Sequence, residues 1–117
     1  MRALNIVLGL LMVAFSAVQY NDPDALLWVA YYGVPAVCSI AVAFRPQDFR
    51  GAAMHLLVAC LAGVVLLTVY YWPQVPDFWR KDVWINEESA REGMGLMIAS
   101  LAVAVAVFTA TRQRRSS

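Results

Sequence analysis

Four long apolar runs without a charged side chain constrain this chain more than any other feature of its sequence. The runs are Ala3–Val18, Ala25–Phe44, Ala52–Trp72 and Gly93–Thr111. A bilayer core is roughly 30 Å thick and needs about 20 apolar residues per helix, with a working range of about 17–25. The middle runs meet this length, the last meets it with its amphipathic lead-in, and the first is at the short limit. The runs therefore predict four transmembrane helices.

The residues between the runs are too few to build a second, soluble core. We therefore expect an all-α chain, an integral membrane four-helix bundle with antiparallel up-down topology. It forms a single transmembrane domain over residues 1–117, with helices at approximately 3–20, 24–44, 51–72 and 87–111. The lipid bilayer is the partner that this composition requires.

Charged residues divide between alternate connecting segments. The first, third and fifth segments hold six arginines and one acid: Arg2, Arg45, Asp48, Arg50, Arg112, Arg114 and Arg115. The second and fourth hold seven acids and three bases: Asp22, Asp24, Asp77, Arg80, Lys81, Asp82, Glu87, Glu88, Arg91 and Glu92. Lys and Arg stay cytoplasmic in short loops. We expect a multi-pass protein of the plasma (inner) membrane with N and C termini cytoplasmic, and the sequence has no basic patch for a nucleic acid.

The first run has an alternative interpretation as a cleaved signal peptide. Arg2 precedes an apolar stretch, and the small residues Ala14 and Ser16 stand where a peptidase cuts. The apolar stretch continues past that point, however, and Phe15 disfavours a cut after Ala17. We favour a transmembrane helix, and the topology of the remaining runs is the same in both cases.

Small and polar residues recur at helical spacing in the first and last runs. In the first run they are Asn5, Gly9, Met12, Ser16 and Gln19, and in the last they are Gly95, Ala99, Ala102, Ala106 and Ala110. Steps of three and four place each set on one helix face. Such faces pack against other helices in a membrane, because small residues let backbones approach closely. Aromatic residues near the outer ends of the middle runs, Trp28, Tyr31, Tyr32, Tyr70, Tyr71 and Trp72, predict an interfacial belt.

Two outer segments carry the candidate site. Its residues are Gln19, Tyr20, Asn21, Asp22, Asp24, Glu88, Arg91 and Glu92. These segments come from different hairpins of one small bundle, so we expect them to meet, with Arg91 contacting residues 19–24. Carboxylate and amide oxygens suit a hard cation, a polar ligand or a partner protein. The structural alternative is that these acids only cap helices and pair with Arg91 at helical spacing.

The start of the second helix has its own signal. Asp22 followed by Pro23 is typical of a helix start, since the carboxylate caps free N–H groups and proline gives up a donor that has no partner. Asp24 would then lie in the first turn, against the helix dipole.

No metal or cofactor site is predicted, because no spacing resembles a known ligand loop. Cys38 and Cys60 form no Cys-x-x-Cys motif and have no ligand spacing with His55, so they are expected to be free, buried hydrophobic residues. A lone histidine without a nearby carboxylate is more typical of a hydrogen-bonded bundle residue than of a catalyst. Proton-coupled multidrug export needs a carboxylate inside the membrane, and none of the runs contains one.

Two outer motifs resemble those of the transmembrane protein 220 family. The first is the string Gln19-Tyr20-Asn21-Asp22-Pro23-Asp24 leading into Trp28 and Tyr32-Gly33, and the second is Glu88-x-x-Arg91-Glu92-Gly93. The similarity spans nearly the whole length, since both motifs, their order and the four-pass arrangement agree. Ala25 stands where a second proline is common in the family. The resemblance implies a four-pass membrane protein and no particular activity.

These observations favour a non-enzymatic accessory or binding protein. Its extracytoplasmic acidic and aromatic site would hold a ligand, a cation or a membrane partner, with a larger membrane complex or a homo-oligomer as the candidate assembly. The alternative is a small membrane enzyme or carrier in which Asp22, Asp24, Glu88 and Glu92 act as acid/base groups on a lipid-soluble or outer-side substrate. An enzyme would leave one carboxylate unpaired and desolvated, whereas an accessory protein would have its carboxylates capped or paired.

Overall fold

The computed structural model describes residues 2–21, 24–72, 80, 82 and 88–116, with the backbone alone at 20–21, 88–90 and 113–116. These residues form four long α-helices and two short 3-10 turns, so the all-α fold class is confirmed. The elements are α1 (Arg2–Ala17), η1 (Val18–Asn21), α2 (Ala25–Phe44), η2 (Pro46–Asp48), α3 (Ala52–Tyr70) and α5 (Glu88–Ser116).

Three of these helices are long and apolar enough to cross a bilayer. They are Ala25–Phe44, Ala52–Tyr70 and the part of α5 from Arg91 to Arg112. Helix α1 is apolar but has only 16 residues, about 24 Å at 1.5 Å per residue, and η1 continues its path. The outward surface is apolar, as a bilayer requires. Its most exposed large aliphatic side chains are Val18, Leu26, Val37, Leu56, Leu66 and Val69.

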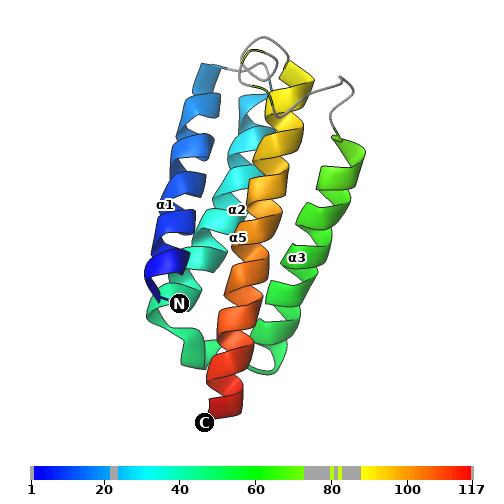
Figure 1. Ribbon diagram of the computed structural model, residues 1–117. Helices are drawn as coiled ribbons and strands as arrows, with labels where there is room; N and C mark the ends of the chain where they lie inside the picture. Colours follow the sequence, from blue (N-terminus) through cyan, green and yellow to red (C-terminus); the bar gives the residue numbers. More distant parts are fainter. Residues whose placement is uncertain (1, 22–23, 73–79, 81, 83–87, 117) are drawn as a thin grey trace.

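The helices alternate in direction, so the bundle has two ends formed by different segments of the chain (Figure 1). One end carries Arg2, the α2–α3 connection at residues 45–51, and Arg112. We call this the terminal end. The other end carries η1, the start of α2, the end of α3 and the start of α5, and we call it the loop end.

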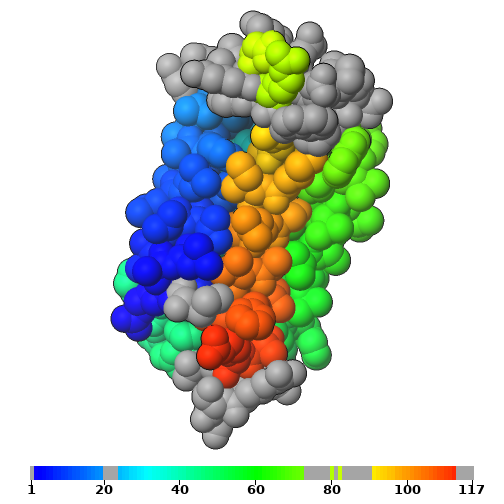
Figure 2. All heavy atoms as spheres, viewed as in Figure 1, coloured from blue at the N-terminus to red at the C-terminus, as the bar shows by residue number. Residues whose placement is uncertain are grey.

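Helices α2 and α5 form the centre of the bundle. Helix α1 packs mainly on α2, whereas α3 packs mainly on α5. The two outer helices therefore lie on opposite sides of the central pair (Figure 1). The space-filling view shows α5, in orange, seated between α1 in blue and α3 in green on one face (Figure 2).

The predicted small-residue stripe of α5 is confirmed as a packing face. Gly95 is buried, and the four alanines at 99, 102, 106 and 110 have no exposed surface. A Cβ added at Gly95 would collide with the hydroxyl of Tyr32 on α2 and would lie 2.9 Å from its Cζ. The absence of a side chain at this position is therefore what lets α2 approach α5.

The predicted inner face of α1 is confirmed in the same way. Asn5 and Met12 are fully buried. A Cβ at Gly9 would lie 2.6 Å from Cγ1 of Ile40, so this glycine sets the close approach of α1 to α2. Toward the loop end, the Ser16 hydroxyl donates a hydrogen bond to the carbonyl of Val29 at 3.0 Å.

Each of the other helices also makes a polar contact with α5. The contacts are Asn5 Nδ2 to Thr109 Oγ1 at 2.8 Å, Ser39 Oγ to Ala102 O at 3.4 Å, and Thr68 Oγ1 to Ser100 Oγ at 2.9 Å. Hydrogen bonds between transmembrane helices contribute about 0.6 kcal/mol on average. Their number is small, but they fix the rotation of three helices about α5.

Candidate functional site

Aromatic rings from α2 and from the end of α3 pack together at the loop end. The Trp28 ring centroid lies 5.1 Å from that of Tyr31 and 5.0 Å from that of Tyr71, and the Tyr31 and Tyr71 centroids are 6.0 Å apart. All three pairs are edge-to-face, an arrangement that the ring quadrupoles favour. We call these three residues the ring cluster. It joins α2 to the end of α3.

Tyr32 extends this packing to the other two helices. Its ring meets Phe15 of α1 edge-to-face at 5.6 Å, and its hydroxyl lies against the backbone of α5 at Gly95. Trp28 and Tyr32 are only 2% and 3% exposed. The expectation of an interfacial belt was therefore wrong for these two residues, while Tyr70 and Trp72, at 78% and 49% exposed, lie at the surface.

The ring cluster carries a hydroxyl pair beside an acid. Tyr71 shares a hydrogen bond with Tyr31, and this bond, followed by burial, raises the pKa of Tyr71 to about 12. The nearby charge of Glu92 adds to the same effect. Glu92 is half-buried in the first turns of α5, so α2, the end of α3 and the start of α5 meet at this point.

Asp24 is hydrogen-bonded to Trp28, a member of the ring cluster. The Trp28 indole N–H donates a hydrogen bond to Asp24 Oδ2 at 3.2 Å. Because α2 begins at Ala25, Asp24 occupies the N-cap position and not the first turn, and its side chain makes no capping hydrogen bond. The prediction that Asp24 lies in the first turn was therefore wrong, because α2 begins two residues later than the predicted start at Pro23. The Asp24 carboxylate accepts a hydrogen bond from the Trp28 indole, one turn along the helix, and makes no hydrogen bond to the free backbone N–H groups of the first turn.

The other candidate residues are described to different extents. Gln19 is half-buried, and its Nε2 donates to the carbonyl of Phe15 at 3.2 Å. Arg91 is exposed at the start of the α5 span. The side chains of Tyr20, Asn21 and Glu88, and the whole of Asp22, lie outside the described residues. The expected contact between Arg91 and residues 19–24 stays a prediction.

Two further exposed groups lie near this end. Arg80 Nε and Asp82 Oδ1 are 3.4 Å apart, with both side chains more than half exposed. Exposed pairs of this kind contribute little to stability. Among the described side chains, no three His, Cys, Asp or Glu residues gather as metal ligands would.

A thiol pair lies away from the loop end. Cys38 on α2 and Cys60 on α3 are both free, as expected, and half-buried. The sequence did not indicate that they are neighbours, yet both thiols pack against the same core cluster and lie near each other. No motif links them, because they are 22 positions apart on two helices. His55, expected to be a hydrogen-bonded bundle residue, is exposed instead.

The loop end brings together aromatic rings, the hydroxyls of Tyr31 and Tyr71, and the carboxylates of Asp24 and Glu92. Sequence reasoning located the acids but missed the ring cluster. The signal for it was the spacing of Trp28, Tyr32, Ala36 and Ser39, which continues one buried face along α2.

Comparisons with known proteins agree with this architecture. Residues 11–108 match the family described as "Transmembrane family 220, helix". A transmembrane protein 220 from Xenopus laevis is 36% identical over 84 residues, which is 71% of this chain and 45% of that relative. The chain thus spans about half the length of the curated relative it matches. No solved structure matches it.

The matched region begins inside α1 and ends inside α5. It therefore includes α2, α3 and the whole loop end, with both outer motifs and the ring cluster between them. Because most of the chain is covered, including all of α2 and α3 and part of α1 and α5, the chain belongs to the transmembrane protein 220 family.

Proposed function

We propose that this protein is a non-enzymatic accessory or binding protein of the plasma (inner) membrane, whose loop end engages a ligand or a membrane partner. The arginine-rich terminal end stays in the cytoplasm in this proposal, because Lys and Arg in short loops resist translocation. The loop end then faces the extracytoplasmic side. The surface offered there is acidic and aromatic.

The observation that carries this proposal is the way the ring cluster holds Asp24. The indole of the buried Trp28 fixes the carboxylate, and the rings of Tyr31 and Tyr71 hold that indole in turn. A surface whose side chains are already ordered loses less entropy on binding. Aromatic residues are also the type that most often dominates binding energy at protein interfaces.

The state of Asp24 supports binding over acid/base catalysis. A general acid or base needs a desolvated carboxyl group beside the reacting atoms. Asp24 is exposed, and its Oδ2 accepts the hydrogen bond from Trp28. A carboxylate in this setting suits recognition of a cationic or hydrogen-bonding group on an incoming molecule.

Co-purification tests the proposal. The wild-type chain and the Asp24→Asn/Glu92→Gln variant are isolated from membranes in a mild detergent, and the bound proteins and small molecules are identified by mass spectrometry. We expect a molecule that is retained by the wild type and lost from the variant. It must rebind to the purified wild-type chain.

The matched control is Asp48→Asn at the terminal end, which removes an exposed acid of the same type. This variant should keep the bound molecule. The proposal fails if Asp48→Asn loses the same molecule, or if the wild type retains nothing beyond what an unrelated four-helix membrane protein retains. Melting temperatures of all three chains show whether any loss reflects unfolding.

A further inference from the structure

The thiol pair lies in the apolar part of the bundle. Cys38 on α2 and Cys60 on α3 are both partly buried, and both pack against the core cluster that contains Val42, Leu57 and Val103. The two side chains lie near each other although they come from different helices. The function proposed for the loop end does not involve them.

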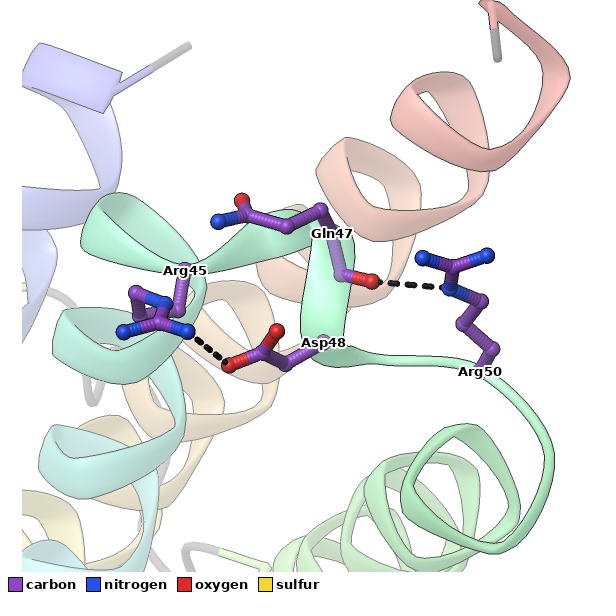
Figure 3. Close-up of polar contacts among 4 residues, drawn as sticks. All are labelled: Arg45, Gln47, Asp48 and Arg50. Atoms are coloured by element: carbon purple, nitrogen blue, oxygen red, sulfur yellow. Dashed lines mark hydrogen bonds and ion pairs between the residues drawn. The ribbon is translucent and has the colours of Figure 1, made fainter.

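A short connection joins the two helices that carry these thiols. In it Arg45 pairs with Asp48 at 3.1 Å, and Arg50 Nε donates a hydrogen bond to the carbonyl of Gln47 at 3.0 Å (Figure 3). Both contacts join residues that are close in sequence, so they stabilise the turn itself. Because the connection is short, α2 ends and α3 begins at nearly the same level of the bundle (Figure 1).

The two thiols consequently lie at a similar depth inside the apolar spans. Cys38 is six residues before Phe44, the last residue of α2, and Cys60 is eight residues after Ala52, the first residue of α3. At 1.5 Å per residue, these positions are about 9 Å and about 12 Å from the helix ends. Such depths lie in the hydrocarbon region of a bilayer, away from the headgroups and from water.

Lipid can reach the thiol pair from the side of α3. Of the three long spans, α3 has the smallest buried share, 22%, and it packs mainly on α5 and much less on α2. Neither thiol is fully buried. Reactive species dissolved among the acyl chains therefore have access to the pair, whereas water-soluble species must first cross the headgroups.

The surroundings of the thiol pair disfavour ionic thiol chemistry. A thiol attacks a peroxide or a disulfide as the thiolate, and an isolated charge in an apolar setting is costly. The one basic side chain in the sequence of α2 and α3 is His55. It is exposed, and it lies about 140° around the helix from Cys60, so it does not face the same side. Transfer of a neutral hydrogen atom has no such cost.

We propose that Cys38 and Cys60 form a radical trap inside the bilayer, which donates two hydrogen atoms to lipid peroxyl radicals and closes as a disulfide. In the first step an S–H bond breaks and an O–H bond forms, which gives a lipid hydroperoxide and a thiyl radical. A second peroxyl radical takes the hydrogen atom of the neighbouring thiol, and the two unpaired sulfur electrons form the S–S bond. In total, two peroxyl radicals and two thiols give two hydroperoxides and one disulfide.

The proximity of the two thiols is essential to this activity. A thiyl radical alone in a bilayer abstracts hydrogen from acyl chains and continues the chain reaction, whereas a second sulfur within bonding reach removes it. Disulfide formation requires specific distances between the two residues, and α3 can adjust toward α2 because it packs mainly on α5. The thiol pair is separate from the loop end, so this activity does not depend on the function proposed above.

Oxidation of the full chain in liposomes tests the proposal. The chain is reconstituted in polyunsaturated phosphatidylcholine with glutathione in the water phase as an internal reference. Peroxyl radicals are generated by a lipid-soluble azo initiator, and a parallel sample receives hydrogen peroxide instead. Intact mass after alkylation reports the protein thiols, and conjugated dienes report lipid oxidation.

We expect the initiator to convert both thiols together into an intramolecular disulfide, before glutathione is oxidised. Diene formation should be delayed by a time that corresponds to two radicals per chain. With hydrogen peroxide, glutathione should react roughly tenfold faster than the thiol pair, because this oxidant needs the thiolate.

Two controls accompany the wild type. Cys60→Ala/Val65→Cys keeps two lipid-accessible thiols, since Val65 is 44% exposed, but it moves one of them by about 7.5 Å along α3 and about 140° around it. Its thiols should react without forming the intramolecular disulfide, and its delay should be shorter. The wild-type chain whose disulfide is closed beforehand should give no delay.

Three results would overturn the proposal. A delay of equal length from Cys60→Ala/Val65→Cys would show that proximity of the thiols is not needed. A delay from the chain with its disulfide already closed would show that other side chains react. Oxidation by hydrogen peroxide as fast as that of glutathione would show an ordinary water-exposed pair. Because the closed chain carries no substitution, it keeps the test decisive even if melting shows that the variant is misfolded.

Discussion

At the scale of single residues, the α5 face that contacts α2 has almost no side-chain volume. Tyr32 occupies the space that a side chain at Gly95 would need, and Ala99, one turn further, has no exposed surface. At Gly95 the α2 side of the contact is the Tyr32 ring, and the α5 side is backbone. Close packing of this kind tolerates added volume poorly.

Ala99→Leu tests this packing. We expect it to lower the free energy of unfolding by about 1–3 kcal/mol, because a larger side chain in a filled interface forces its neighbours out of place. Thermal melting in detergent measures the change. Ala104→Leu is the matched control, since Ala104 lies on the same helix but is exposed to lipid. Equal melting of the two variants would contradict the assignment of the packing face.

At the scale of helices, α5 organises the bundle. It accepts a polar contact from each of the other three helices, and α3 depends on it for most of its packing. Between α2 and the α3 segment, Trp28 packs on Tyr71 and Cys38 lies near Cys60. The thiol pair is therefore a local probe of how α3 is placed.

Oxidative cross-linking tests this placement. Treatment of the purified chain with copper phenanthroline should join Cys38 and Cys60 in an intramolecular disulfide, because the two thiols lie near each other on different helices that pack against one core cluster. The oxidant accepts the two electrons. Intact mass after alkylation measures the result: both thiols should disappear together, without a dimer on a non-reducing gel.

A displaced thiol is the control for that experiment. The Cys60→Ser/Leu61→Cys variant keeps two cysteines at nearly the same depth but turns one by about 100° around α3. It should cross-link far more slowly. If both variants react equally, or if the wild type forms only dimers, α2 and α3 do not meet at Cys38 and Cys60.

Helix periodicity explains what the sequence could and could not predict. Recurrence at steps of three and four located the buried faces of α1 and α5, because a face belongs to one helix alone. The same recurrence in Trp28, Tyr32, Ala36 and Ser39 marks the buried face of α2. The meeting of Trp28 with Tyr71, and of Cys38 with Cys60, depends on how two helices rotate and cross. Those angles are set by all side chains at the contact. At the candidate site, the sequence located Asp24 and Glu92 but not the rings that hold them.

At the scale of the whole molecule, the two ends of the bundle differ in charge. The even number of long helices among the described residues places the start of α1 and the end of α5 at the same end, and six of the eight arginines in the sequence belong to that end. The same division sets the expected orientation in the membrane. We expect the terminal end in the cytoplasm.

Reporter fusions test the orientation. A reporter that is active only outside the cytoplasm should give signal when fused after Gln74. The same reporter should be silent after Gln47 or Ser117, because both positions lie in arginine-rich segments. Signal from the Ser117 fusion, or silence from the Gln74 fusion, would contradict the prediction that the terminal end is cytoplasmic. Matched expression levels, checked by immunoblot, exclude trivial loss of signal.

The central position of α5 has a consequence for biosynthesis. A ribosome makes the chain from its N-terminus, so α1, α2 and α3 enter the bilayer before the helix that their polar groups require. Until α5 follows, Asn5 and Ser39 lack the partners that they have in the finished bundle, and unsatisfied polar groups in lipid are costly. The first three helices can insert into the bilayer, but they cannot complete their packing before α5 is present. We therefore expect a nascent chain stalled before residue 88 to lack most of the packing of α3 and the partners of Asn5 and Ser39.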